Sequence, residues 1–214
     1  YNLQQVVFSY NGGSYSIFGD SLSFGAILPN EFITLTIKRN RKIELKKGVT
    51  TLGEFEKINL IETKSGFSIS LSGKIPVVKE RKYKNDFEIT AAEKGLTVVN
   101  MVDMNNYLAG VVESEGGGGK ELEYYKVQAL MSRTYALKYL NKHQAEGFSL
   151  CDRVHCQAYH SMVRFTPSIE VAVLATENVV MKDDNNQLVD AYFHANCGGQ
   201  TSEAEYVWNS NVPY

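Results

Sequence analysis

Two ionisable residues occupy positions that an ordinary core segment would not favour. Glu115 lies directly before a run of four glycines, and Arg133 falls on an apolar face of the longest helix that the sequence predicts. A carboxylate beside mobile backbone can donate a proton if its site is partly desolvated. Near the start of a helix it can instead be an ordinary residue that compensates the helix dipole. Glu113 is the rival acid, and we expect it to be the solvated one of the two.

Arg133 needs a partner whatever its role. A buried guanidinium without one is too costly, so a carboxylate, backbone carbonyls or a ligand must meet it. The helix that carries Arg133 is apolar nearly all round, which predicts that this helix lies buried at the centre of its domain.

A second candidate site is a loop with two cysteines. Cys151 and Cys156 are separated by four residues that include His155, while His143 lies upstream and His160 downstream. Two cysteines and a histidine within reach can bind zinc tetrahedrally. The spacing is looser than that of a CxxC pair, so a Cys151–Cys156 disulfide and two free thiols are both alternatives.

Several classes of function are disfavoured. The segment GGGGKE lacks the spacing of a phosphate-binding Walker loop and the Ser or Thr after its lysine. Ser114 and Ser132 do not lie in a G-x-S-x-G elbow. With 22 Lys plus Arg against 24 Asp plus Glu, the chain has no basic excess for nucleic acid. No apolar run approaches about 18 residues. We expect no nucleic-acid partner, no organic cofactor and no membrane span.

Alternating strands separated by turns dominate the first part of the chain. Glu31 to Ile37 alternates apolar and polar residues, as a half-buried strand does. The basic run from Lys38 to Lys47 is typical of a solvated edge strand. Residues 1–89 are therefore predicted to form a β-rich subdomain.

Residues 90–214 are predicted to form a core of a different character. Asp103 caps a short helix from Met104 to Gly110, and a central long helix runs from Lys120 to about Gln144. A shorter helix covers Ile169 to Thr176, and a C-terminal hairpin turns at Asp183 to Asn186. The predicted fold class is α+β. The chain starts at Tyr1 and stops at Tyr214 without a helix stop, so we expect both ends to be trimmed.

Four motifs then appear in a fixed order. They are Tyr107-Leu-x-Gly-Val-Val-x-Ser-Glu115, then Lys126-x-Gln128-Ala129-x-x-Ser132-Arg133-Thr134-Tyr135-Ala136, then Cys151-Asp152-x-x-His155-Cys156-Gln157-x-Tyr159, and finally Tyr192-Phe193-x-x-x-Cys197-Gly198-Gly199-x-Thr201 with Val207-Trp208. Together they resemble the core of the stage II sporulation protein D family (SpoIID/LytB domain).

This resemblance implies an extracytoplasmic protein of the bacterial cell envelope that acts on peptidoglycan. Sporulation members of the family are lytic transglycosylases that cut glycan strands stripped of stem peptides, and other members modify cell-wall amidases. The family's catalytic acid corresponds to Glu115. Some members bind zinc in the cysteine loop, which implies Cys151 and Cys156 as ligands, with His143 added.

The same resemblance places further residues around a glycan. Arg133 and Gln128 are expected to shape the cleft, and the other expected substrate residues are Ser132, Tyr159, Tyr192, Gly198, Gly199 and Thr201. For the tyrosines, packing in the core is an equally good explanation. The family commonly has Met-Pro after the acid where this chain has glycines, and more backbone freedom there would loosen the positioning of Glu115.

Two other functions are compatible with the sequence. A binding or regulatory module would grip glycan or an amidase without cutting, and the glycine run favours this alternative. A purely structural envelope protein held by zinc would show metal-dependent folding and no affinity for glycan.

Overall fold

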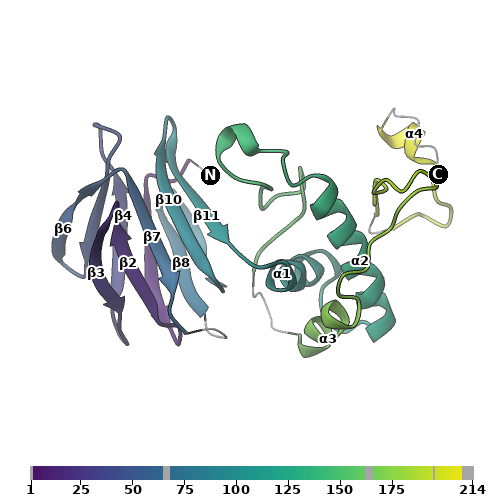
Figure 1. Cartoon of the computed structure of the whole chain (residues 1–214), viewed down its shortest axis with the longest axis horizontal. Helices are drawn as coiled ribbons and strands as arrows, with labels where there is room; N and C mark the ends of the chain where they lie inside the picture. The colour runs from purple at the N-terminus through teal and green to yellow at the C-terminus, as the bar shows by residue number, and fades with distance from the viewer. Residues whose placement is uncertain (1, 65–67, 162–165, 195, 209–214) are drawn as a thin grey trace. The chain divides into compact units, whose positions relative to one another are not determined.

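A computed structural model describes residues 2–64, 68–161, 166–194 and 196–208. The chain forms two compact units, the first up to Asn106 and the second from Tyr107, with Ser161 returning to the first unit. Strands make up the first unit and helices dominate the second (Figure 1), which confirms the predicted α+β class. None of the described helices is long and apolar enough to cross a membrane.

The first unit consists of two antiparallel sheets. One has the strand order β6-β5-β4-β1-β8-β9 and the other β11-β10-β7-β2-β3. The strands are β1 (Gln5–Asn11), β2 (Tyr15–Gly19), β3 (Leu22–Ile27), β4 (Phe32–Ile37), β5 (Ile43–Lys47), β6 (Thr50–Phe55), β7 (Lys57–Glu62), β8 (Ser68–Ile75), β9 (Val77–Tyr83), β10 (Asp86–Ala92) and β11 (Gly95–Met101). Phe8 of β1 meets Phe87 of β10 edge to face at 5.0 Å, so aromatic side chains join the two sheets in one core.

Two expectations about this unit need adjustment. The unit runs past residue 89 because β10 pairs with β7 and β11 pairs with β10, which makes both strands part of the five-stranded sheet. The basic run is not an edge strand, since β5 lies between β4 and β6. Its lysines are matched by carboxylates, with Lys38 and Glu44 at 2.9 Å and Lys47 and Glu31 at 2.8 Å.

The helices are α1 (Met104–Gly116), α2 (Leu122–Lys138), the short 3-10 helix η1 (Gln144–Glu146), α3 (Pro167–Ala175) and α4 (Ala204–Trp208). Asp103 caps α1 as predicted, because its carboxylate accepts a hydrogen bond from the Asn106 backbone at 2.8 Å. However, α1 continues past Gly110 to Gly116, and α2 ends at Lys138 rather than near Gln144.

The long helix α2 is only partly buried. Tyr125, Ala129 and Arg133 face the interior, and α2 packs along α3 (Figure 1). The other side, which was expected to be buried as well, exposes Tyr124 and Val127 with 43% and 56% of their surface accessible. In the described part of the chain, α2 is therefore a helix with one interior face.

The predicted C-terminal hairpin is reduced to one bridge between Lys182 and Leu188. The reason is that α2 takes the backbone groups that a partner strand would need. Met181 donates its N–H to the Thr134 hydroxyl at 3.1 Å, and the Val179 carbonyl accepts from Arg133 at 3.2 Å.

Candidate functional site

The two glutamates of the first motif lie on the last turn of α1, and Glu113 is not the solvated one that was expected. Glu113 is the buried one, 7% exposed, and its Oε1 accepts hydrogen bonds of 3.0 Å from both the N–H and the hydroxyl of Thr166. Thr166 is the N-cap residue of α3. Glu113 therefore supports the start of α3, where a negative charge is favoured.

Glu115 is half-buried and held by the backbone of another segment. Its Oε1 accepts a hydrogen bond of 2.7 Å from the N–H of Ala158. One residue earlier, the Ser114 hydroxyl accepts from the N–H of His160 at 2.9 Å and donates to the Gly110 carbonyl at 2.6 Å. Residues 158–160 thus run along the end of α1 and orient the Glu115 carboxylate.

The glycine run forms a turn that is held by hydrogen bonds at both ends. Gly117 and Gly119 have φ values of +67° and +76°, which glycine adopts without strain. The Gly117 N–H donates to the Glu113 carbonyl at 3.1 Å. The buried Tyr125 hydroxyl donates to the Gly117 carbonyl and accepts from the Lys120 N–H, both at 3.1 Å. One phenol therefore connects both ends of the turn that follows Glu115.

Arg133 finds its partners in backbone carbonyls. The side chain is 4% exposed, and its guanidinium donates to the carbonyls of Val173, Thr176 and Val179 at 3.1, 2.6 and 3.2 Å. These groups lie at and just beyond the C-terminus of α3, where a cation complements the helix dipole. Burial lowers the pKa of Arg133 from its usual value. The described contacts give Arg133 a structural role, with backbone carbonyls as its partners, and its contact with glycan stays a prediction.

Gln128 and Ser132 are also interior residues. They are 6% and 0% exposed, and the Gln128 amide donates to the Ser132 hydroxyl at 3.4 Å. Gln157 donates to the Ser132 carbonyl at 3.3 Å and accepts from the Tyr107 hydroxyl at 3.0 Å. Tyr159, 7% exposed, packs on Tyr107 with ring centroids 5.2 Å apart. These residues join α1, α2 and the segment after Cys156, and the contacts with substrate expected for Gln128, Ser132 and Tyr159 stay predictions.

The cysteine loop gathers four side chains that can bind a metal. Ligand atoms of His143, Cys151, His155 and Cys156 all lie within 4.8 Å of one another. Both sulfur atoms lie 3.8 Å from His155 Nδ1. Zinc distances of about 2.3 Å to sulfur and about 2.0–2.1 Å to nitrogen place neighbouring ligand atoms of a tetrahedron about 3.3–3.8 Å apart. Both cysteines are free thiols in this structure.

One atom of this cluster tests the fit to a metal directly. Nε2 of His143 is buried and has no hydrogen-bond partner among the described residues. Nδ1 of the same ring lies 2.6 Å from a Glu146 carboxylate oxygen, and the ring stacks on Phe148. A carboxylate that accepts the Nδ1 proton leaves the Nε2 lone pair for a metal. The donor set therefore fits zinc, with His155 as a fourth ligand that the sequence prediction omitted.

The segment that carries the metal cluster continues directly into the residue that contacts Glu115. Cys156 is followed by Gln157, which bonds to Tyr107, and by Ala158, which bonds to Glu115. On the other side, Lys142 donates to the His155 carbonyl at 2.7 Å. The loop that carries the candidate metal ligands therefore also positions the candidate acid.

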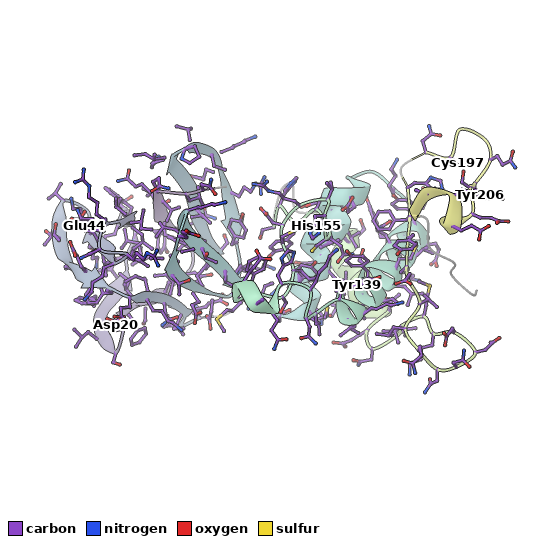
Figure 2. All side chains as sticks on the ribbon, turned by 90° about the horizontal axis from the view of Figure 1, so that it is seen from above. Asp20, Glu44, Tyr139, His155, Cys197 and Tyr206 are labelled. Carbon is purple, nitrogen blue, oxygen red and sulfur yellow. The ribbon has the colours of Figure 1, made fainter. Side chains whose placement is uncertain are left out.

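The C-terminal motif is not gathered into this group. Gly198, Gly199 and Thr201 are exposed, and Figure 2 shows Cys197 apart from His155. Tyr192 is half-buried beside Asp190, whose carboxylate accepts from Tyr139 and pairs with Lys138 at 2.6 Å. The sugar-facing role expected for these residues stays a prediction.

Parts of this sequence are similar to known proteins. Residues 92–182 match the family model described as stage II sporulation protein, SpoIID. An uncharacterised protein of Brachyspira hyodysenteriae is 29% identical over 190 residues, which cover 87% of this chain and 47% of that protein. Stage II sporulation protein D of Bacillus subtilis is 28% identical over 54% of this chain and 38% of its own length.

A third relative is named for a different role. The amidase enhancer of Bacillus subtilis is 30% identical over 50% of this chain and 14% of its own length. The alignments thus span less than half the length of each of these relatives. No solved structure matches the chain.

Proposed function

We propose that the protein remodels the bacterial cell wall by cutting peptidoglycan glycan strands. The proposal rests on residues 92–182, which belong to the stage II sporulation protein (SpoIID) family. The likeness to this family supports both the proposed peptidoglycan substrate and the proposed extracytoplasmic location. The reaction is that of a lytic transglycosylase, with Glu115 as the catalytic acid.

One observation carries this assignment. Of the two acids in the motif, Glu115 is the one whose carboxylate is both oriented and open to a ligand. Glu113 is 7% exposed and committed to Thr166, whereas Glu115 is half-buried and held by the N–H of Ala158. Acid catalysis needs such a fixed carboxyl group within reach of the substrate.

The proposed reaction uses one carboxyl group twice. Glu115 gives its proton to the oxygen between C1 of N-acetylmuramic acid and the next sugar, and the C1–O bond breaks through an oxocarbenium-like transition state. The C6 hydroxyl of the same muramic acid then attacks C1, and the Glu115 carboxylate takes the hydroxyl proton. A C6–O–C1 bond replaces the broken bond, so no water is consumed and a 1,6-anhydro end forms.

Zinc is the metal that suits the four-residue cluster, with His143, Cys151, His155 and Cys156 as the residues that would hold it. A closed site of this kind supplies a structural cross-link. The loop is connected to α1 by two hydrogen bonds, from Tyr107 to Gln157 and from Ala158 to Glu115. An ordered loop therefore holds the Glu115 carboxylate in position.

The test is digestion of purified, peptide-free glycan strands followed by mass analysis of the new ends. The wild-type chain should produce 1,6-anhydro ends, and Glu115→Gln should produce none. Glutamine keeps an oxygen that accepts the Ala158 hydrogen bond but has no carboxyl proton, so the fold is preserved. Glu121→Gln, at an exposed position, is the matched control. Wild type without anhydro ends, or equal ends from Glu115→Gln, would exclude the enzyme.

A second candidate function has an observation of its own. The likeness to a protein named amidase enhancer favours a module that binds glycan or an amidase and does not cut. This alternative predicts that a cell-wall amidase digests peptidoglycan faster when the chain is added, and that Glu115→Gln stimulates it equally. Stimulation that disappears with Glu115→Gln would instead support cutting by this chain.

A further inference from the structure

An exposed aromatic ring lies beside the proposed acid and has no role so far. Tyr124 is 43% exposed on the first turn of α2, whereas its neighbour Tyr125 is fully buried. The two rings meet edge to face with centroids 5.8 Å apart. Because the Tyr125 hydroxyl is tied to Gly117 and Lys120, Tyr124 rests on a supported ring.

The Tyr124 ring packs on the residue that follows Glu115. A Cβ atom on Gly116 would lie 3.0 Å from Cε1 and 3.3 Å from the hydroxyl oxygen of Tyr124. A side chain at position 116 would therefore require the Tyr124 ring to shift by a few tenths of an ångström. Gly116 does not have a positive φ, so its backbone conformation does not require glycine. Gly118, by contrast, has only an ordinary contact of 3.5 Å to Thr166.

This packing sets the distance between the ring and the acid. Consecutive Cα atoms are about 3.8 Å apart, so a ring in contact with residue 116 lies next to the backbone of Glu115. The charged residues around Tyr124 do not cover it, since Lys120, Glu121 and Glu123 are exposed and Glu123 pairs with Lys126 at 2.7 Å. An exposed aromatic surface, supported by Tyr125, thus lies one residue along the backbone from Glu115.

We propose that Tyr124 is the stacking surface for a pyranose ring bound next to Glu115, an inference that rests on the proposed glycan substrate. The face of a pyranose that carries axial C–H groups is apolar and slightly positive, and it complements the electron-rich face of an aromatic ring. Tyrosine offers this surface at low cost in side-chain entropy. Tyr124 is therefore a substrate-binding residue, and Gly116 is the position that makes room for it.

Binding is measured in a Glu115→Gln background, with peptide-free glycan strands as the probe in a co-sedimentation assay. Tyr124→Ala should weaken binding about three- to tenfold, in line with the energy of one aromatic contact. Tyr124→Phe keeps the ring and should stay within about twofold. Tyr206→Ala, which removes a tyrosine that is 79% exposed on α4, should leave the affinity unchanged.

Two glycine variants test the packing itself. Gly116→Ala favours the helix but displaces the Tyr124 ring, so it should weaken binding in the same direction as Tyr124→Ala. Gly118→Ala meets no obstacle and should bind like the parent. Circular dichroism and thermal melting confirm that each variant is folded. Unchanged affinity of Tyr124→Ala overturns the inference.

The failure of this inference can be told from failure of the proposed function. If wild type produces anhydro ends and Tyr124→Ala cuts with the same KM, the function stands and the stacking role is wrong. If wild type produces no ends while Tyr124→Ala still loses affinity for glycan, the chain is a binding module and the stacking role stands.

Discussion

Glu113 and Arg133 hold the two ends of the same helix. Glu113 of α1 accepts from Thr166 at the N-terminus of α3, and Arg133 of α2 donates to Val173 and Thr176 at its C-terminus. An anion at the start and a cation at the end both complement the helix dipole. Glu113 and Arg133, two charged residues that the sequence presents as candidates for function, thus hold α3 in contact with α1 and α2.

Glu113 and Glu115 should separate stability from activity. Glu113→Ala leaves the two Thr166 donors without the Glu113 acceptor in a partly buried setting and should lower the free energy of unfolding by about 1–2 kcal/mol. Glu115→Ala removes one bond at a half-buried site and should cost less. Urea denaturation measures both values. A larger loss for Glu115→Ala would contradict the assignment of Glu113 as the structural acid.

Arg133→Lys should destabilise the protein even though the charge is kept. Lysine cannot reproduce the planar fork that reaches three carbonyls, and it leaves buried acceptors unpaired at a cost of about 1–3 kcal/mol. Thermal melting compares this variant with Arg39→Lys, an exposed control that should melt like wild type. Weaker glycan binding by Arg133→Lys at unchanged stability would instead assign Arg133 to the substrate.

Glu146 should strengthen metal binding without touching the metal. Removing its carboxylate frees Nδ1 of His143 and releases the tautomer that presents Nε2. We expect Glu146→Ala to lower zinc affinity about tenfold, toward the low end of such effects because the Glu146 side chain is 63% exposed. Competition with a zinc-binding dye measures the affinity, and Glu93→Ala, exposed in the first unit, is the matched control.

The same preparation separates zinc from a disulfide. Metal analysis should find one zinc per chain, and Cys151 and Cys156 should react with a thiol reagent only after a chelator removes it. A metal-free chain in which both thiols are unreactive until reduction would show that the disulfide forms instead.

Asp190 should contribute stability that disappears in acid. Burial raises its pKa, but the hydrogen bonds from Lys138 and Tyr139 outweigh burial, and the net result is a pKa below the ordinary value. Because the folded pKa is lower, the contribution is complete above the unfolded value of about 3.9 and is lost as pH falls through the folded pKa.

Melting temperatures of wild type and Asp190→Asn measure this effect. The gap between the two should be largest near neutral pH and should shrink below about pH 4. Other carboxyl groups titrate equally in both proteins, so they cancel in the comparison. A gap that stays constant with pH would contradict the charged pairing of Asp190 with Lys138.

Much of the fold was predictable because local patterns dominate it. The β-rich first part, the Asp103 cap and the order of the helices follow from alternation, capping chemistry and helical period. The end of α1 was not predictable from Gly110, since this glycine is buried within the helix and its carbonyl accepts from Ser114. Tertiary packing there overrides the usual preference of glycine for helix ends.

Most residues around Glu115 and the cysteine loop were predictable from the sequence, but their burial and their hydrogen-bond partners were not. His155 could have been found, because a closed structural zinc site needs four ligands and His155 adjoins Cys156. Which glutamate is buried could not be found, since that depends on Thr166, 53 positions along the chain from Glu113. Local spacing contains no information on such a partner.

The hydrogen bond between Ala158 and Glu115 joins residues 43 positions apart. During synthesis, the proposed acid therefore emerges long before the backbone group that orients it. The Ser114 hydroxyl likewise accepts its hydrogen bond from His160, which lies 46 positions later in the chain. A nascent or prematurely ended chain that stops after α2 has the acid but not its support. The proposed site would therefore be complete only late in translation, and the proposed activity would be absent from incomplete chains.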